Sequence, residues 1–178
     1  IIDQFQLKYL EMGYLISGFM VGYMFAGPLM SYLSGRQNPF SLILVNLILG
    51  AVAMIAMAMA GNYFYVFLGL RALLGFAVGS LTSLAPPLII EDNKRIQSAN
   101  IQLAFYFMMV PLGLGIGFLV GAFSSISVNY VTWQACFAVG GIISAILAVL
   151  YIKIFPKDYQ NSALAGYTAR EALAKLWQ

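Results

Sequence analysis

Arg71 is the residue of this 178-residue chain whose type and position most strongly suggest chemistry. It stands eight residues into the apolar stretch that follows Asn62, roughly 12 Å of helix rise from the start of that stretch. If the stretch crosses a membrane, a guanidinium at this depth is costly unless it finds protein, water or an anion. Arg71 therefore either extends back to the membrane surface or faces a polar cavity. We expect the cavity, with Glu11 at the start of the first apolar stretch as a candidate partner.

Other polar side chains within apolar stretches can extend such a polar lining. They are Ser17, Asn46, Thr82, Gln102 and Gln134. Each of them is equally compatible with a hydrogen bond between two packed helices, so their types alone do not choose between the two roles.

Several kinds of chemistry are excluded by what the chain lacks. It has no histidine and one cysteine, Cys136, which removes His-based metal sites and Ser-His-Asp or Cys-His catalysis. No paired carboxylates occur within the apolar stretches. The net charge of +3 is scattered, without a basic stripe interleaved with aromatic residues. We therefore predict no enzyme, no metal, no cofactor and no nucleic-acid partner.

The composition predicts an integral membrane protein. Hydrophobic residues make up 62% of the chain and charged residues 8%, and the mean hydropathy is +0.88. Soluble domains carry about 25% charged residues, so this chain cannot cover a water-exposed surface of ordinary polarity. Lipid must be the main solvent, and the fold class is all-α because helices satisfy their own backbone groups in lipid.

Five stretches are long enough to span the bilayer, since a crossing helix needs about 20 apolar residues. They run over residues 9–34, 40–60, 63–90, 98–124 and 132–155, and together they form a predicted helical bundle over 1–155. Residues 156–178 are predicted to be an amphipathic tail on the membrane surface or a linker to the rest of the protein. The chain begins Ile-Ile-Asp and no signal peptide precedes the first span, so we expect a fragment whose beginning is missing.

Lysine and arginine predict the orientation of these spans. One side of the membrane would hold Arg36, Lys94, Arg95, Lys153, Lys157, Arg170 and Lys175, and the other side only Lys8. The positive-inside rule makes the first side cytoplasmic, or its equivalent in an organelle.

Small residues recur at every fourth position in three spans. The stripes are Gly18 and Gly22; Gly75, Gly79 and Ser83; and Gly113, Gly117 and Gly121. Such stripes allow helix backbones to approach closely in lipid, so we expect the third and fourth spans to pack along theirs. Pro86, Pro87 and Pro111 are expected to break or bend their helices.

The residues in these spans resemble those of a known family. The stretch from Arg71 through Gly75 to Gly79 is similar to the arginine-and-glycine signature on the fourth helix of major facilitator superfamily transporters. The segment from Gly27 to Arg36 resembles that superfamily's cytoplasmic loop between helices two and three. The closest likeness is to Spinster-like lipid transporters. It rests on Ala85-Pro86, Tyr106-Phe107, the Pro111 to Gly121 glycine pattern, and Trp133.

The resemblance implies a partial six-helix bundle, with this chain as helices two to six of a twelve-helix protein. It implies a substrate or ion pathway lined by Arg71, Thr82, Gln102 and Tyr106, with Glu11 beside it. It also implies a conformational or gating motif, comprising Gly27, Arg36, Gly75, Gly79, Pro111, Gly113, Gly117 and Gly121. Implied partners are membrane lipid, a small-molecule or lipid substrate, and a second transporter half.

Two departures from the family pattern bear on function. Ser31 and Tyr32 stand where the family loop usually carries Asp and Arg, and Val78 stands where Spinster-like proteins place a glutamate linked to proton coupling. The first hypothesis is a secondary active transporter that moves an organic solute or amphiphilic lipid by alternating access. The alternative is a transporter-derived structural subunit of a larger membrane complex without transport activity, which these departures favour.

Overall fold

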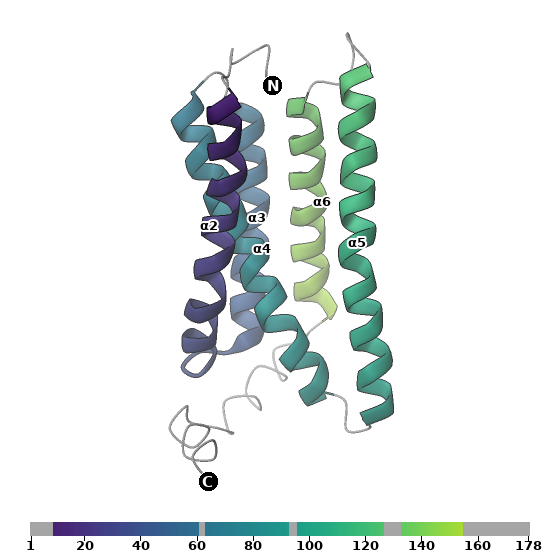
Figure 1. Ribbon diagram of the computed structural model, residues 1–178. Coiled ribbons are helices and arrows are strands. Elements are labelled where there is room, and N and C mark those ends of the chain that lie inside the picture. The colour runs from purple at the N-terminus through teal and green to yellow at the C-terminus, as the bar shows by residue number, and fades with distance from the viewer. Residues whose placement is uncertain (1–8, 61–62, 93–95, 127–132, 155–178) are drawn as a thin grey trace.

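The computed structural model describes residues 9–60, 63–92, 96–126 and 133–154, and within these ranges every regular element is a helix. The helices are α2 (Tyr9–Ser34), α3 (Pro39–Met59), α4 (Phe64–Asp92), α5 (Ile96–Ile126) and α6 (Trp133–Ile154) (Figure 1). All five are long and apolar enough to cross a membrane. The all-α membrane fold is thus confirmed, and the helix ends lie within two residues of the predicted spans.

A tight turn joins α2 to α3 and reverses the chain. The backbone N–H groups of Arg36 and Gln37 donate to the Leu33 carbonyl, which closes α2. Asn38 then caps α3, because its side-chain oxygen accepts a hydrogen bond of 3.0 Å from the Phe40 N–H. Proline at the first helical position, residue 39, fits because that N–H would have no partner in the helix.

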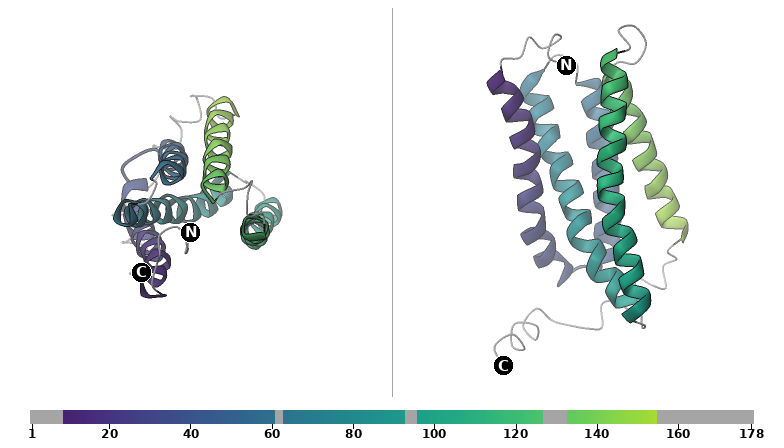
Figure 2. Two further views of the ribbon diagram at one scale, coloured as in Figure 1. Left: turned by 90° about the horizontal axis from the view of Figure 1, so that it is seen from above. Right: turned by 45° about the vertical axis from the view of Figure 1, so that its right-hand side comes forward.

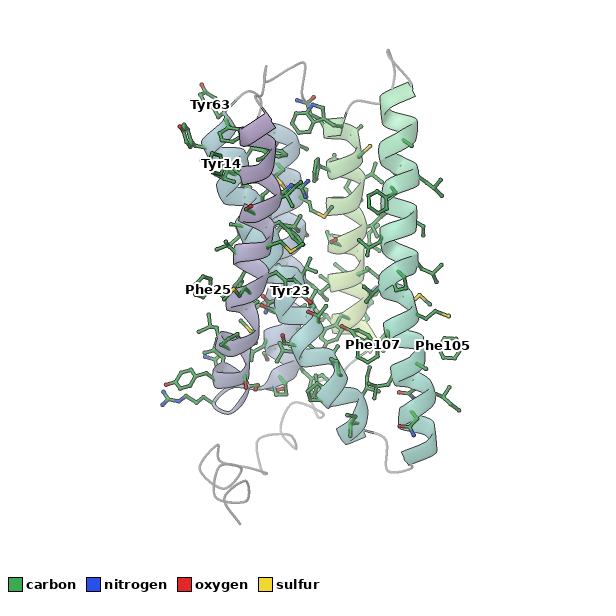
Figure 3. All side chains as sticks on the ribbon, in the orientation of Figure 1. Tyr14, Tyr23, Phe25, Tyr63, Phe105 and Phe107 are labelled. Atoms are coloured by element: carbon green, nitrogen blue, oxygen red, sulfur yellow. The ribbon has the colours of Figure 1, made fainter. Side chains whose placement is uncertain are left out.

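The helix ends alternate between the two ends of the bundle. The end of α2 and the end of α4 lie together at one end, and the end of α3 lies at the other (Figure 1). This arrangement agrees with the predicted placement of the Arg36 and Lys94 segments on one side of the membrane, although Lys94 itself lies outside the described residues. Exposed Tyr14 and Tyr63 stand at the opposite end (Figure 3). Tyrosine is typical of the membrane–water interface.

Proline interrupts none of the described helices. Pro28, Pro86, Pro87 and Pro111 all lie inside continuous helix, so of the two expected effects, breaking or bending, the prolines do not break their helices. In α4 the hydroxyl of Ser80 hydrogen-bonds to a backbone carbonyl one turn earlier, as do those of Thr82 and Ser83. Such bonds bend helices, and so do prolines within a helix such as Pro86 and Pro87, which follow directly. Just beyond them, α4 leans away from α2 and toward the start of α5 (Figures 1 and 2).

A buried hydrophobic cluster packs α2, α3 and α4 together near the α2–α3 turn. It consists of Met30, Leu42 and Leu84. Asn46 is buried close by, and its amide donates to the Leu42 carbonyl at 2.8 Å and to the Met30 sulfur at 3.7 Å. Of its two proposed roles, Asn46 therefore takes the interhelical one.

Glycine brings α2 and α4 into backbone contact. A Cβ atom added to Gly22 would overlap the carbonyl of Ala72, and one added to Gly75 would overlap the carbonyl of Phe19. We call this contact, with Gly79, the α2–α4 glycine contact. It confirms that the small-residue stripe of the third span is a packing surface.

The glycines of α5 lie in different surroundings. A Cβ atom added to Gly113, Gly117 or Gly121 would meet nothing within 4 Å. The prediction that the third and fourth spans pack along their stripes is therefore wrong for the described residues, because α4 uses its stripe on α2. Helix α5 stands at the edge of the bundle (Figure 2), and its side chains between 107 and 122 are all exposed.

Candidate functional site

Arg71 lies on α4 with its side chain half-buried inside the bundle. The central carbon of its guanidinium lies 5.4 Å from the ring centre of Phe137 on α6, a cation–π distance. Its Nε atom is buried and has no hydrogen-bond partner among the described residues. Arg71 therefore contacts a protein side chain, but its Nε–H group donates to none of the described residues.

Phe137 belongs to an aromatic cluster with Phe67 and Trp133. The three rings meet edge to face, with centroid distances of 5.5, 5.9 and 6.1 Å. Phe67 is buried one helical turn before Arg71, so the same face of α4 presents both side chains toward α6. Of the three rings, Phe137 contacts the guanidinium, and Phe67 and Trp133 pack against the Phe137 ring. Phe137 was not among the residues predicted from the sequence.

Thr82 stands on the same face of α4 as Arg71. Eleven residues separate them, which is three helical turns and about 16 Å of rise. Val78 lies between them on this face and is 37% exposed. The face thus carries a cation, an apolar residue and a hydroxyl in succession.

Thr82 connects α4 to α2 through a residue that was not predicted. Its hydroxyl oxygen lies 3.1 Å from the Tyr23 hydroxyl and 2.9 Å from the Gly79 carbonyl. Tyr23 projects from α2 toward α4, whereas Phe25 projects to the other side of α2 (Figure 3). No signal in the sequence singles out Tyr23, because its contact is with a residue 59 positions away on another helix.

Tyr106 lies on the side of α5 that is turned toward the bundle. Of the α5 side chains from 100 to 122, only Leu103 and Tyr106 are not exposed, and they lie one turn apart. Phe105 points away from the bundle (Figure 3). Tyr23 and Thr82 thus join α2 to α4, while Tyr106 lies on the side of α5 that faces the bundle.

The remaining predicted pathway residues are not brought into this group. Gln102 lies on α5 one turn before Tyr106 and is exposed. Glu11 belongs to the first turns of α2, but its side chain lies outside the described residues. Ser17 is exposed and Gln134 is half-buried.

The predicted gating residues lie in three places: the α2–α4 glycine contact, the turn after α2, and the exposed surface of α5. Gly27 continues the α2–α4 glycine contact, since a Cβ added there would lie 3.5 Å from the Ser83 hydroxyl. Arg36 stacks over the Tyr32 ring at 4.6 Å in the turn after α2. Pro111, like the α5 glycines, is exposed. Among the side chains that the structure describes, no three His, Cys, Asp or Glu residues gather as a metal site.

Comparison with known proteins places these observations in a family. The sequence matches the family description "Major Facilitator Superfamily" over residues 1–176. The chain belongs to this superfamily. Its members are integral membrane transporters, so this superfamily chain is a membrane protein and not an enzyme.

The relatives of this superfamily chain confirm the Spinster resemblance. The probable sphingolipid transporter spinster homolog 1 of Arabidopsis thaliana is 32% identical over 153 residues, which are 86% of this chain and 30% of the relative. The sphingosine-1-phosphate transporter SPNS2 of Mus musculus is 26% identical over 162 residues, 90% of this chain and 29% of the relative. The chain spans about a third of the length of these relatives.

Proposed function

We propose that this chain forms part of the first half of a secondary active transporter. It would move an organic solute, most specifically an amphiphilic lipid with an anionic headgroup, by alternating access. The observation that carries the proposal is the buried Nε of Arg71, which has no hydrogen-bond partner among the described residues. The names of the relatives, which are sphingolipid and sphingosine-1-phosphate transporters, support the lipid class.

The chemistry of Arg71 suits such a headgroup. A buried polar group without a partner costs about 1–3 kcal/mol, and more for a charged group, so a ligand that completes it gains binding free energy. Guanidinium presents a planar set of donors that matches phosphate or carboxylate with two parallel hydrogen bonds. The contact with the Phe137 ring is attractive but supplies no conventional hydrogen-bond acceptor to the N–H donors of the guanidinium.

The other predicted pathway residues would serve later parts of the same route. Thr82 lies about 16 Å further along the same face of α4, and Tyr106 approaches from α5. Gln102 lies one turn before Tyr106, and Glu11 is proposed beside the entrance. The route would be completed by a second transporter half, since transporters of this kind bind substrate between two repeats.

The rocking motion would use the glycine residues in two ways. The α2–α4 glycine contact is close enough to move as a unit, because backbone against backbone leaves little freedom to slide. Helix α5, with the exposed surface that carries Pro111, Gly113, Gly117 and Gly121, would be the moving surface. Gly27 and Arg36 would limit the movement at the turn after α2.

Arg71→Ala in the protein expressed from its complete coding sequence tests the proposal. We expect uptake of radiolabelled sphingosine-1-phosphate into proteoliposomes to fall about 10- to 100-fold, the value of one or two charge-assisted hydrogen bonds. Arg71→Lys should restore little, because lysine lacks the bidentate fork.

Lys153→Ala is the matched control, since Lys153 is an exposed cation at the end of α6. It should leave uptake unchanged. Equal uptake by the wild type and Arg71→Ala, at equal protein level, would contradict the proposal.

A structural subunit without transport activity is the second candidate. Val78 favours it. This exposed apolar residue lies between Arg71 and Thr82 on one face of α4, at the position where Spinster-like proteins place a glutamate. On this hypothesis the wild type shows no uptake above empty liposomes, and Arg71→Ala changes only assembly with its partner proteins. Co-purification of the wild type and the variant with endogenous membrane proteins measures that change.

A further inference from the structure

The hydroxyl groups of Tyr23 and Thr82 form a pair, called here the hydroxyl cluster, where α2 and α4 meet. Tyr23 contributes from the middle of α2 and Thr82 from the second half of α4. Two other side-chain bonds between helices, Asn46 to Met30 and Ser144 to Met54, use a weakly accepting methionine sulfur. In the hydroxyl cluster the Tyr23 and Thr82 oxygens lie 3.1 Å apart instead.

Tyr23 retains hydrogen-bonding capacity in this arrangement. It is 41% exposed, and a phenol both donates and accepts. Thr82 carries one proton and lies within bonding distance of both the Gly79 carbonyl and Tyr23, so it cannot donate to both at once. If Thr82 donates to Tyr23, the Tyr23 proton is free to bind a further partner. If Thr82 donates to the Gly79 carbonyl, Tyr23 donates to Thr82 and a lone pair of the Tyr23 oxygen is free.

The neutral character of the hydroxyl cluster determines what it can bind. Hydroxyls offer both donors and acceptors without charge, so they match an alcohol or amide rather than compensating a phosphate. Arg71 is about 16 Å away along α4. That is too far for one small headgroup to occupy both places at once, so the two positions would act at different depths of the route.

We propose that Tyr23 is a specificity-determining residue, and that the hydroxyl cluster is a second subsite which binds the hydroxyl group of an amphiphilic substrate. This inference rests on the proposed transport function and adds a residue and a ligand group to it. When a headgroup moves away from Arg71 within an apolar bundle, it loses its hydrogen bonds. A second polar position along the route can replace them. The hydroxyl cluster supplies that position on the same face of α4.

Tyr23→Phe tests the subsite because it removes one oxygen and keeps the ring. The probes are sphinganine-1-phosphate and its analogue that lacks the 3-hydroxyl, which carry the same phosphate and chain. Uptake of each into proteoliposomes gives a ratio of kcat/KM. We expect the wild type to prefer the hydroxylated lipid, and Tyr23→Phe to lower that preference about two- to tenfold, the value of one neutral hydrogen bond.

Tyr14→Phe is the matched control. Tyr14 lies nine residues earlier, on the opposite face of α2, and is exposed. It should keep the wild-type ratio. Thr82→Val in the Tyr23→Phe background should lower the ratio little further, because both substitutions remove the same cluster.

The outcomes separate this inference from the proposed function. If Tyr23→Phe lowers uptake of both probes equally and also lowers thermal stability, Tyr23 is only a helix–helix contact and the inference is overturned. The same holds if the ratio does not change while Arg71→Ala still abolishes uptake. If the wild type transports neither lipid, the proposed lipid function fails, and the subsite falls with it.

Discussion

The α2–α4 glycine contact and the outward surface of α5 carry the same sequence pattern in opposite surroundings. In the first, a methyl group at Gly22 or Gly75 would overlap the backbone of the neighbouring helix. In the second, a methyl group at Gly113 or Gly117 would meet nothing within 4 Å. Both patterns place glycine at every fourth position, so spacing alone does not separate a formed contact from an open one.

The difference shows what a small-residue stripe specifies. It sets how closely a helix can be approached, because the absence of Cβ removes the steric limit. It does not specify the neighbour, since any helix with a matching small surface can occupy it. Helix α2 offers such a surface through Gly18 and Gly22, and α4 takes it.

The largest effect is expected from Gly75→Ala, at one of the two most crowded positions of the α2–α4 glycine contact. The added methyl overlaps the Phe19 carbonyl, and a backbone group cannot rotate away. We expect a loss of about 3 kcal/mol of stability or more, the upper end for overpacking. Thermal unfolding in detergent and the yield of monodisperse protein measure it.

Gly69→Ala on the same helix is its control. Gly69 has nothing within 4 Å, so the variant should unfold at or slightly above the wild-type temperature. Normal stability of Gly75→Ala would show that α2 and α4 are further apart in the membrane.

An intermediate effect is expected from Gly79→Ala. The added methyl would lie 2.8 Å from the Ala26 methyl and 2.8 Å from the Tyr23 carbonyl oxygen. We expect a loss of about 1–3 kcal/mol, because small shifts of α2 can relieve part of the contact. The same unfolding measurement applies.

Ala26→Gly provides the test of cause for Gly79→Ala. It removes one of the two close contacts, so the double variant should lose less stability than the sum of the single variants. Simple additivity would show that the Ala26 methyl is not the obstacle.

The smallest effect is expected from Gly117→Ala on α5. Its methyl enters open space, and replacing glycine by alanine in a helix gains up to about 1 kcal/mol. Stability should stay equal or rise slightly. A loss as large as that of Gly79→Ala would break the comparison, because it would place a second packing partner on α5 from outside the described residues.

The fold was predictable to the level of five helices and their ends. Apolar length fixes a span, and the turn of Asn38 and Pro39 marks its start. The neighbour of each helix was not predictable, because α4 and α5 carry equivalent stripes. The sequence also left the role of Asn46 open, since only its position beside Met30 and the Leu42 carbonyl decides it.

The candidate site was predictable only for a residue whose depth in the membrane is itself unusual. Arg71 stands out because an arginine in an apolar span must be accommodated. Phe137 and Tyr23 do not stand out, since the chain has 13 phenylalanines and 11 tyrosines. Their roles depend on contacts across 66 residues to Arg71 and 59 residues to Thr82, which spacing within one helix cannot express. The pathway and gating roles stay predictions.

The aromatic cluster beside Arg71 gives the protein an optical probe of its own. Trp133 is one of two tryptophans in the chain, and its indole lies edge-on against Phe67 and Phe137. Indole emission responds to the polarity and charge around the ring. Because Phe137 also carries the guanidinium of Arg71, any ligand that draws this cation away changes the electric field at Trp133. Replacing Trp177 with Phe would leave Trp133 as the single tryptophan of these 178 residues, so that its emission wavelength reports substrate binding beside Arg71.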